Sequence, residues 1–182
     1  MSPSPTARRY PMAPLIRFTL LALYLALVLP LPVMAPPGLR LPLLLAAVAG
    51  LLLVVAITSE RVELDERGLR VGHPPWCAWL LRRGWQLSWD RITALTPVST
   101  SQGGRVYYVR TAGAEGDCSG AAWLLPQRIA RFEDFLERFA AATGLATDGI
   151  GRISPPWTYR LLALLCALLL AGEGLALVAR PS

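Results

Sequence analysis

Long apolar stretches flank one polar central region along the chain. The apolar stretches cover residues 18–34, 41–58 and 161–179, and an arginine lies close to the ends of each. A helix of about 20 mostly apolar residues crosses the ~30 Å hydrocarbon core of a bilayer, so each stretch is long enough to span it. Prolines between the first two stretches predict a tight turn. We therefore expect a transmembrane hairpin over residues 18–59 and a separate third span.

The first apolar stretch also has features of a secretory signal peptide. Arginines precede it, and Val33-Met34-Ala35 resembles a small-residue cleavage site. However, Pro36 would directly follow the cut, and the next apolar stretch begins six residues after Ala35. These features favour a retained hairpin, with cleavage as the alternative.

In the central region, residues 60–145, the spacing of apolar residues changes once, from the period of a strand to that of a helix. Apolar and polar residues alternate on both sides of a turn in Val62–Val71, which predicts a β-hairpin, and short alternating stretches continue to residue 125. Apolar residues then recur at helical spacing, which predicts an amphipathic helix over about 129–143 that Gly144 ends. Six or seven antiparallel strands followed by one helix predict a small β-sandwich or open barrel capped by that helix.

The net charge of +6 lies almost entirely outside the central region. All 18 basic residues are arginines, and residues 60–159 contain 12 of them beside 11 acidic residues. The others flank apolar stretches, which is typical of topogenic charge and not of a nucleic-acid surface, so we expect no nucleic-acid partner. The positive-inside tendency predicts that the tail, residues 1–17, and the central domain are cytoplasmic. Residues 146–160 would then be a linker to the third span.

One segment of the central region concentrates aromatic and basic side chains. Trp76 and Trp79 precede Arg82 and Arg83, and Trp85 follows them. Indole rings and guanidinium groups suit the membrane–water interface, so these five residues are candidates for contact with lipid or a partner. The alternative is that the tryptophans fill the core of the β domain.

Glu173 is the only ionisable residue inside the third apolar stretch. A charge at that depth costs about 2.5–3.5 kcal/mol on insertion scales, which predicts a pairing partner. Arg40, on the same side of the membrane, and a separate transmembrane partner are the candidates, and a protonated residue without a role is the alternative. Alanines recurring every four residues in this stretch predict packing against Ala46 and Gly50 of the second helix.

The sequence contains no recognisable catalytic or metal-binding pattern. It has a single histidine, His73, and its three cysteines lack metal-ligand spacing and fit a reducing compartment. The small polar stretch at residues 116–120 is more typical of a solvated turn than of a nucleophile loop. We therefore expect neither an enzyme nor a bound cofactor.

Three motifs resemble those of bacterial pleckstrin-homology-like (PH-like) domains in small membrane proteins. They are the hairpin Val62–Leu69, the turn Ser88-Trp89-Asp90-Arg91-Ile92 and the phenylalanine-rich helix Phe132–Phe139. The resemblance implies a PH-like β domain beside a transmembrane hairpin and assigns no activity. The layout is also similar to that of the photosystem I assembly-factor family of cyanobacteria and plastids, from which the third span departs.

These observations predict a multi-pass membrane protein of mixed α and β structure. It would lie in a bacterial inner membrane, or in the thylakoid if the source is a cyanobacterium. Its expected role is that of a non-enzymatic scaffold or assembly factor for a protein complex or lipid at the cytoplasmic face. Membrane lipid and another membrane protein or complex are the expected partners. The alternative is a subunit of a membrane enzyme or transporter whose chemistry is not recognisable.

Overall fold

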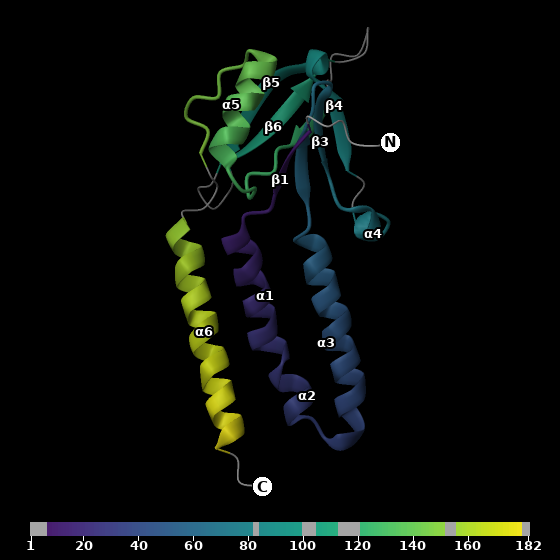
Figure 1. Ribbon diagram of the computed structural model, residues 1–182, viewed down its shortest axis with the longest axis vertical. Helices are drawn as coiled ribbons and strands as arrows, with labels where there is room; N and C mark the ends of the chain where they lie inside the picture. The colour runs from purple at the N-terminus through teal and green to yellow at the C-terminus, as the bar shows by residue number, and fades with distance from the viewer. Residues whose placement is uncertain (1–6, 82–83, 100–104, 113–120, 152–155, 180–182) are drawn as a thin grey trace. The chain divides into compact units, whose positions relative to one another are not determined.

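A computed structural model describes residues 7–81, 84–99, 105–112, 121–151 and 156–179 of the chain. The chain divides into two compact units. One unit comprises Met1–Ala13 and Glu60–Ser154, and the other comprises Pro14–Ser59 and Pro155–Ser182. The strands belong to the first unit and the long apolar helices to the second (Figure 1). The predicted mixture of apolar helices with antiparallel sheet is confirmed.

Four helices make up the described part of the helical unit. They are α1 (Pro14–Val28), α2 (Pro30–Met34), α3 (Pro37–Ile57) and α6 (Pro156–Val178). By length and composition, α1 with α2, α3 and α6 provide three segments able to cross a membrane. Helices α1, α3 and α6 each begin about four residues before the apolar stretch that predicted them. Arg17, Arg40 and Arg160 therefore lie in or near the first turn of their helices. The long arginine side chain allows this, because its apolar stem can lie along a hydrophobic surface while the charge reaches water.

Within the helical unit, α1 packs against both α3 and α6. The Tyr24 hydroxyl of α1 donates a hydrogen bond to the Ala47 carbonyl oxygen of α3 at 2.7 Å. A side chain at Gly50 would collide with the Tyr24 ring, so the glycine is what lets this ring approach α3. On the other side, Thr19 of α1 donates to the Tyr159 carbonyl of α6 at 3.4 Å. The prediction that α6 packs on Ala46 and Gly50 is therefore wrong, because Gly50 already receives Tyr24.

The described strands of the first unit form two antiparallel sheets. The four-stranded sheet has the order β1 (Arg8–Pro11), β2 (Arg61–Leu64), β3 (Gly68–Gly72) and β4 (Trp85–Ser88). The three-stranded sheet has the order β5 (Ile92–Ser99), β6 (Arg105–Thr111) and β7 (Ala122–Leu124). The predicted hairpin is β2–β3, with Val62 opposite Val71. A short helix, α4 (Pro75–Ala78), connects β3 to β4.

Strand β1 corrects the assignment of residues 1–17 to a tail. Arg8–Pro11 pairs with β2 along its whole length, with Tyr10 opposite Val62. The chain then continues in extended form, because Met12 bridges Ile129 and the Ala13 amide donates to the Arg128 carbonyl at 2.8 Å. The described part of the predicted tail therefore supplies the edge strand of the four-stranded sheet before α1 begins.

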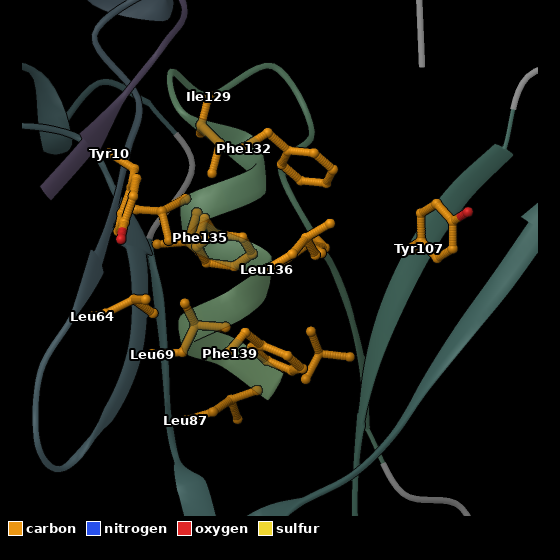
Figure 2. Packing of buried hydrophobic residues seen from close by; sticks show 14 of the residues in the cluster. Tyr10, Leu64, Leu69, Leu87, Tyr107, Ile129, Phe132, Phe135, Leu136 and Phe139 are labelled. Carbon is orange, nitrogen blue, oxygen red and sulfur yellow. The ribbon is translucent and has the colours of Figure 1, made fainter. Parts of the chain in front are cut away.

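Helix α5 (Phe132–Thr143) covers the core, as its phenylalanine spacing predicts. Figure 2 shows Phe135, Leu136 and Phe139 directed between Leu69 of the four-stranded sheet and Tyr107 of the other. The helix begins three residues later than predicted, because Ile129 still belongs to the extended chain paired with Met12. It ends at Gly144, which has a positive φ of 69° and donates its amide to the Ala140 carbonyl, as expected for a C-cap glycine.

The predicted linker begins later than residue 146. Leu145 and Ile150 pack against the core, the Tyr107 hydroxyl donates to the Gly149 carbonyl, and the Gln127 amide donates to the Gly151 carbonyl at 2.9 Å. The first part of the expected linker therefore belongs to the β domain, since its backbone carbonyls accept bonds from the core side chains.

Tyr10 joins β1 to helix α5. Its side chain is fully buried, its ring meets Phe135 edge to face at 5.6 Å, and its hydroxyl donates to Asp134 at 2.6 Å. Burial, followed by the bond to Asp134, raises the pKa of Tyr10 to about 12. The same bond, followed by Arg138, holds the pKa of Asp134 below its usual value against the opposing effect of burial.

Replacing Tyr10 with phenylalanine should destabilise the β domain and change its response to alkali. Loss of a hydrogen bond to a carboxylate costs about 1.5–3 kcal/mol. In the wild type, the raised pKa of Tyr10 contributes stability below pH 10, which is lost as pH rises toward about 12. The Tyr10→Phe variant should lack this component of the alkaline loss. Tryptophan-fluorescence unfolding of the full chain in mild detergent measures both effects.

Tyr108→Phe is the matched control, since Tyr108 lies in β6 and its hydroxyl has no hydrogen bond among the described residues. Equal unfolding temperatures and equal alkaline profiles for the two variants would contradict the role given to Tyr10.

Candidate functional site

The predicted tryptophan–arginine segment forms an exposed turn around α4. Trp76 is 53% exposed, Trp79 is 79% exposed and Leu80 is 55% exposed. The Trp79 indole donates to the Trp76 carbonyl at 2.9 Å, and buried Cys77 anchors the turn on the domain. We call Trp76, Trp79 and Leu80 the aromatic turn. Its apolar surface is open to solvent in the β domain, as a lipid or partner contact requires.

Trp85 behaves differently from the other two tryptophans. It lies at the start of β4, packs against the core and meets Trp123 at a ring distance of 5.7 Å. Trp85 therefore packs in the core of the β domain, as the alternative interpretation expected. The exposed positions of Trp76 and Trp79 are compatible with contact to lipid or a partner. Arg82 and Arg83 lie outside the described residues.

A polar row crosses the outer face of the four-stranded sheet beside the aromatic turn. The pairing places Arg9 opposite Glu63, Glu63 opposite Arg70, and Arg70 opposite Gln86. Adjacent residues on these strands, among them Tyr10, Val62 and Leu69, point to the core, as the pleat requires. Glu63 forms ion pairs with Arg9 at 3.0 Å and with Arg61 at 3.1 Å. Within the described structure, Arg70 has no carboxylate partner.

These side chains line a cleft of about 220 Å³, which we call the arginine cleft. Its described polar lining consists of Arg61, Glu63, Arg70, His73 and Gln86. The Nδ1 atom of His73 is buried and has no hydrogen-bond partner in the described part of the chain. Two arginines, an imidazole and an amide give the cleft the donors that an anionic group needs.

Sequence reasoning missed the arginine cleft. The alternation Arg61-Val62-Glu63-Leu64 predicts that Arg61 and Glu63 share one face of a strand. The alternation does not predict the register of β2, β3 and β4, which brings Arg70 and Gln86 into the same row as Glu63. It also gives no sign that Arg9 belongs to the same sheet.

Glu173 lies in α6 of the helical unit, where it lines an apolar pocket. The opposite wall includes Val33 and Met34 of α2. No ion pair joins Glu173 to Arg40 in the structure, and the Arg40 guanidinium donates instead to the Ala35 carbonyl at 3.0 Å. The predicted pairing of these two residues is therefore not found, and Glu173 has no charged partner among the described residues.

The loop at residues 116–120, considered with His73 as a nucleophile site, lies outside the described residues. Among the residues that the structure does describe, no three histidine, cysteine or acidic side chains gather as a metal site would require.

Two tryptophan substitutions should separate the aromatic turn from the core. Trp79→Ser removes an exposed side chain and should change the unfolding free energy by no more than about 0.5 kcal/mol. Trp85→Ser removes the ring that packs on Trp123 and should cost about 2 kcal/mol or more. Thermal unfolding of the full chain in mild detergent measures the difference. Comparable destabilisation by both changes would show that Trp79 also belongs to the core.

Comparison with known proteins finds a relative that matches most of the chain. The chain is 41% identical over 174 residues to the uncharacterised protein slr0269 of the cyanobacterium Synechocystis sp.. The matched region covers 93% of this chain and 84% of the relative. No family model and no solved structure matches. The chain therefore belongs to the same protein family as this cyanobacterial protein.

Proposed function

We propose that the protein is a non-enzymatic, multi-pass membrane scaffold or assembly factor with a PH-like β domain at the cytoplasmic face. Its partner is another membrane protein or complex. The protein contacts this partner through Glu173 inside the membrane and holds it near the lipid surface. The observation that carries the proposal is this carboxyl group, which lines an apolar pocket without a described counter-charge.

The chemistry of the Glu173 pocket supports a transmembrane partner. An acidic group inside hydrocarbon is costly unless it pairs or takes up a proton. The wall formed by α2 is apolar, and Arg40 in the first turn of α3 donates to the Ala35 carbonyl. A partner helix that brings a basic or hydrogen-bond-donating side chain would both fill the pocket and satisfy the carboxyl group.

The pairing of β1 with β2 supports the hairpin topology. Paired strands of one sheet must share one side of a bilayer, so the pairing favours residues 8–11 and 61–64 on the same side. An even number of crossings between them, as in a two-helix hairpin, meets this requirement. Signal-peptide cleavage after Ala35 would remove buried Tyr10 from the core, so the pairing favours a retained first helix.

The arginine distribution supports a cytoplasmic β domain. Arg8 and Arg9 precede the hairpin, Arg17 lies in its first helical turn, and Arg61 and Arg67 follow it. At the other end of the hairpin, the first turn of α3 carries Arg40. Under the positive-inside rule, this bias favours a cytoplasmic location for both ends of the hairpin. Two antiparallel sheets covered by helix α5 support the PH-like assignment. The motifs that the sequence shares with that domain type support it as well.

Purification of the tagged full chain from its native membrane in mild detergent tests the proposed function. A stoichiometric partner should accompany the wild type, and Glu173→Leu should reduce its recovery about tenfold or more, as loss of a buried charge pair does. Glu173→Gln should have an intermediate effect, because the amide still forms hydrogen bonds. Leu168→Ala, an exposed position on α6, is the control.

Equal recovery with wild type and Glu173→Leu would rule out the intramembrane contact. A purified complex that turns over a substrate or transports one would favour the alternative of an enzyme or transporter subunit.

Cysteine labelling of sealed membrane vesicles tests the orientation. Gly38→Cys places a thiol in the exposed first turn of α3, where the added side chain meets no neighbouring side chain or backbone atom within 4 Å. An impermeant reagent should label it only in vesicles that expose the extracytoplasmic face. Cys118 should be labelled only in vesicles of the opposite orientation, and Cys77, which is 2% exposed, only after denaturation. Labelling of Gly38→Cys and Cys118 from the same face would contradict the topology.

A further inference from the structure

We propose that the arginine cleft binds the phosphate of an anionic phospholipid headgroup while the aromatic turn lies in the membrane interface. This inference rests on the membrane location in the proposed function and names the lipid that the β domain would contact. The ligand chemistry is a phosphate monoanion presented by a bilayer surface.

The cleft has free donors because its one carboxylate is already neutralised. Glu63 is held between Arg9 and Arg61, so the polar row retains a net positive charge. Arg70 is exposed and unpaired among the described residues, and it faces the same cleft as His73. A phosphate bound there would accept hydrogen bonds from the Arg70 guanidinium and the Gln86 amide. His73 lines the same cleft, and its buried Nδ1 atom has no hydrogen-bond partner among the described residues.

Two short links join this end of the sheet to α1 and α3. Pro11 of β1, Arg61 of β2 and Gly72 of β3 are neighbours across the sheet. Two residues connect Pro11 to the start of α1, and three connect the end of α3 to Arg61. Because an extended chain spans at most about 3.3–3.6 Å per residue, both links are short whatever the orientation of the domain. If α1 and α3 span the membrane, this end of the sheet lies near the lipid headgroups.

The aromatic turn leaves the sheet at this tethered end. His73 directly follows Gly72, and α4 begins two residues later, so Trp76 and Trp79 extend from the edge that carries both links. Tryptophan is enriched at the level of the headgroups, where its ring is in an apolar layer and its N–H can find a polar partner. An apolar turn beside a cationic cleft thus matches the two layers of a phospholipid surface.

Lipid retention by the full chain tests the proposal. The protein is reconstituted into nanodiscs of equal parts phosphatidylcholine and phosphatidylglycerol, and retained lipids are identified by native mass spectrometry. The wild type should retain phosphatidylglycerol in preference to phosphatidylcholine. Arg70→Gln should reduce that preference about fivefold, the factor expected for one arginine near an anionic surface. Arg110→Gln changes an exposed arginine near the C-terminal end of β6, is the matched control and should have no effect.

Each remaining outcome overturns the proposal. Equal retention of the two lipids would remove the anionic specificity, and an equal loss with Arg110→Gln would show that only net charge matters. Displacement of the lipid by inorganic phosphate would indicate a site for a free anion. An acidic protein that binds through Arg70 in the absence of lipid preference would identify a protein surface instead.

A second measurement tests the aromatic turn. Lipids brominated near the headgroup should quench the tryptophan fluorescence of the reconstituted wild type. In a Trp157→Phe background, which removes the exposed tryptophan at the start of α6, the Trp76→Phe/Trp79→Phe variant should lose most of that quenching. Trp85→Phe, whose ring packs on Trp123, should keep it. Unchanged quenching in the double variant would place the turn away from the lipid. Since neither experiment alters Glu173, failure here with intact partner recovery would overturn the lipid site and leave the proposed function standing.

Discussion

The buried Tyr10 side chain and its bond to Asp134 are the interaction on which the rest of the β domain depends. Tyr10 holds β1 against β2 on one side and helix α5 on the other, with its hydroxyl 2.6 Å from the Asp134 carboxylate. Residues separated by 124 positions in sequence are thus joined within one core. Because the two apolar helices of the hairpin lie between β1 and β2 in the chain, formation of this sheet also fixes both ends of the hairpin on one side of any membrane it spans.

The local patterns of the sequence predicted much of the fold. Stretches of apolar residues identified all three long helices, and the alternation in Val62–Val71 identified the β2–β3 hairpin. The phenylalanine spacing identified α5, and Gly144 marked its end. These features depend on contacts between residues close in the chain or on composition alone, which is why a single sequence was sufficient.

The features that were missed depend on distant pairing. Arg8–Pro11 is short, arginine-rich and bounded by proline, so its composition is that of a tail, and only β2 and the segment before α5 make it a strand. The arginine cleft depends on the same pairing, since Arg9 neutralises Glu63 and leaves Arg70 unpaired in the described structure. The tryptophan-rich segment likewise divides between solvent and core, because α4 turns Trp79 outward before β4 brings Trp85 against Trp123. Composition alone does not distinguish these two environments.

Cross-linking of β1 to β2 in the native membrane tests this account most directly. Cysteines replace Arg9 and Glu63, which face each other on the outer side of the sheet, and a protease site is placed at the turn around Gly38. The account predicts that mild oxidation keeps the two halves covalently joined after cleavage, whereas cysteines at Arg9 and Arg110 leave them separable. Separation of the halves in the Arg9–Glu63 variant, or equal cross-linking in both variants, would show that the N-terminal segment is not part of the sheet.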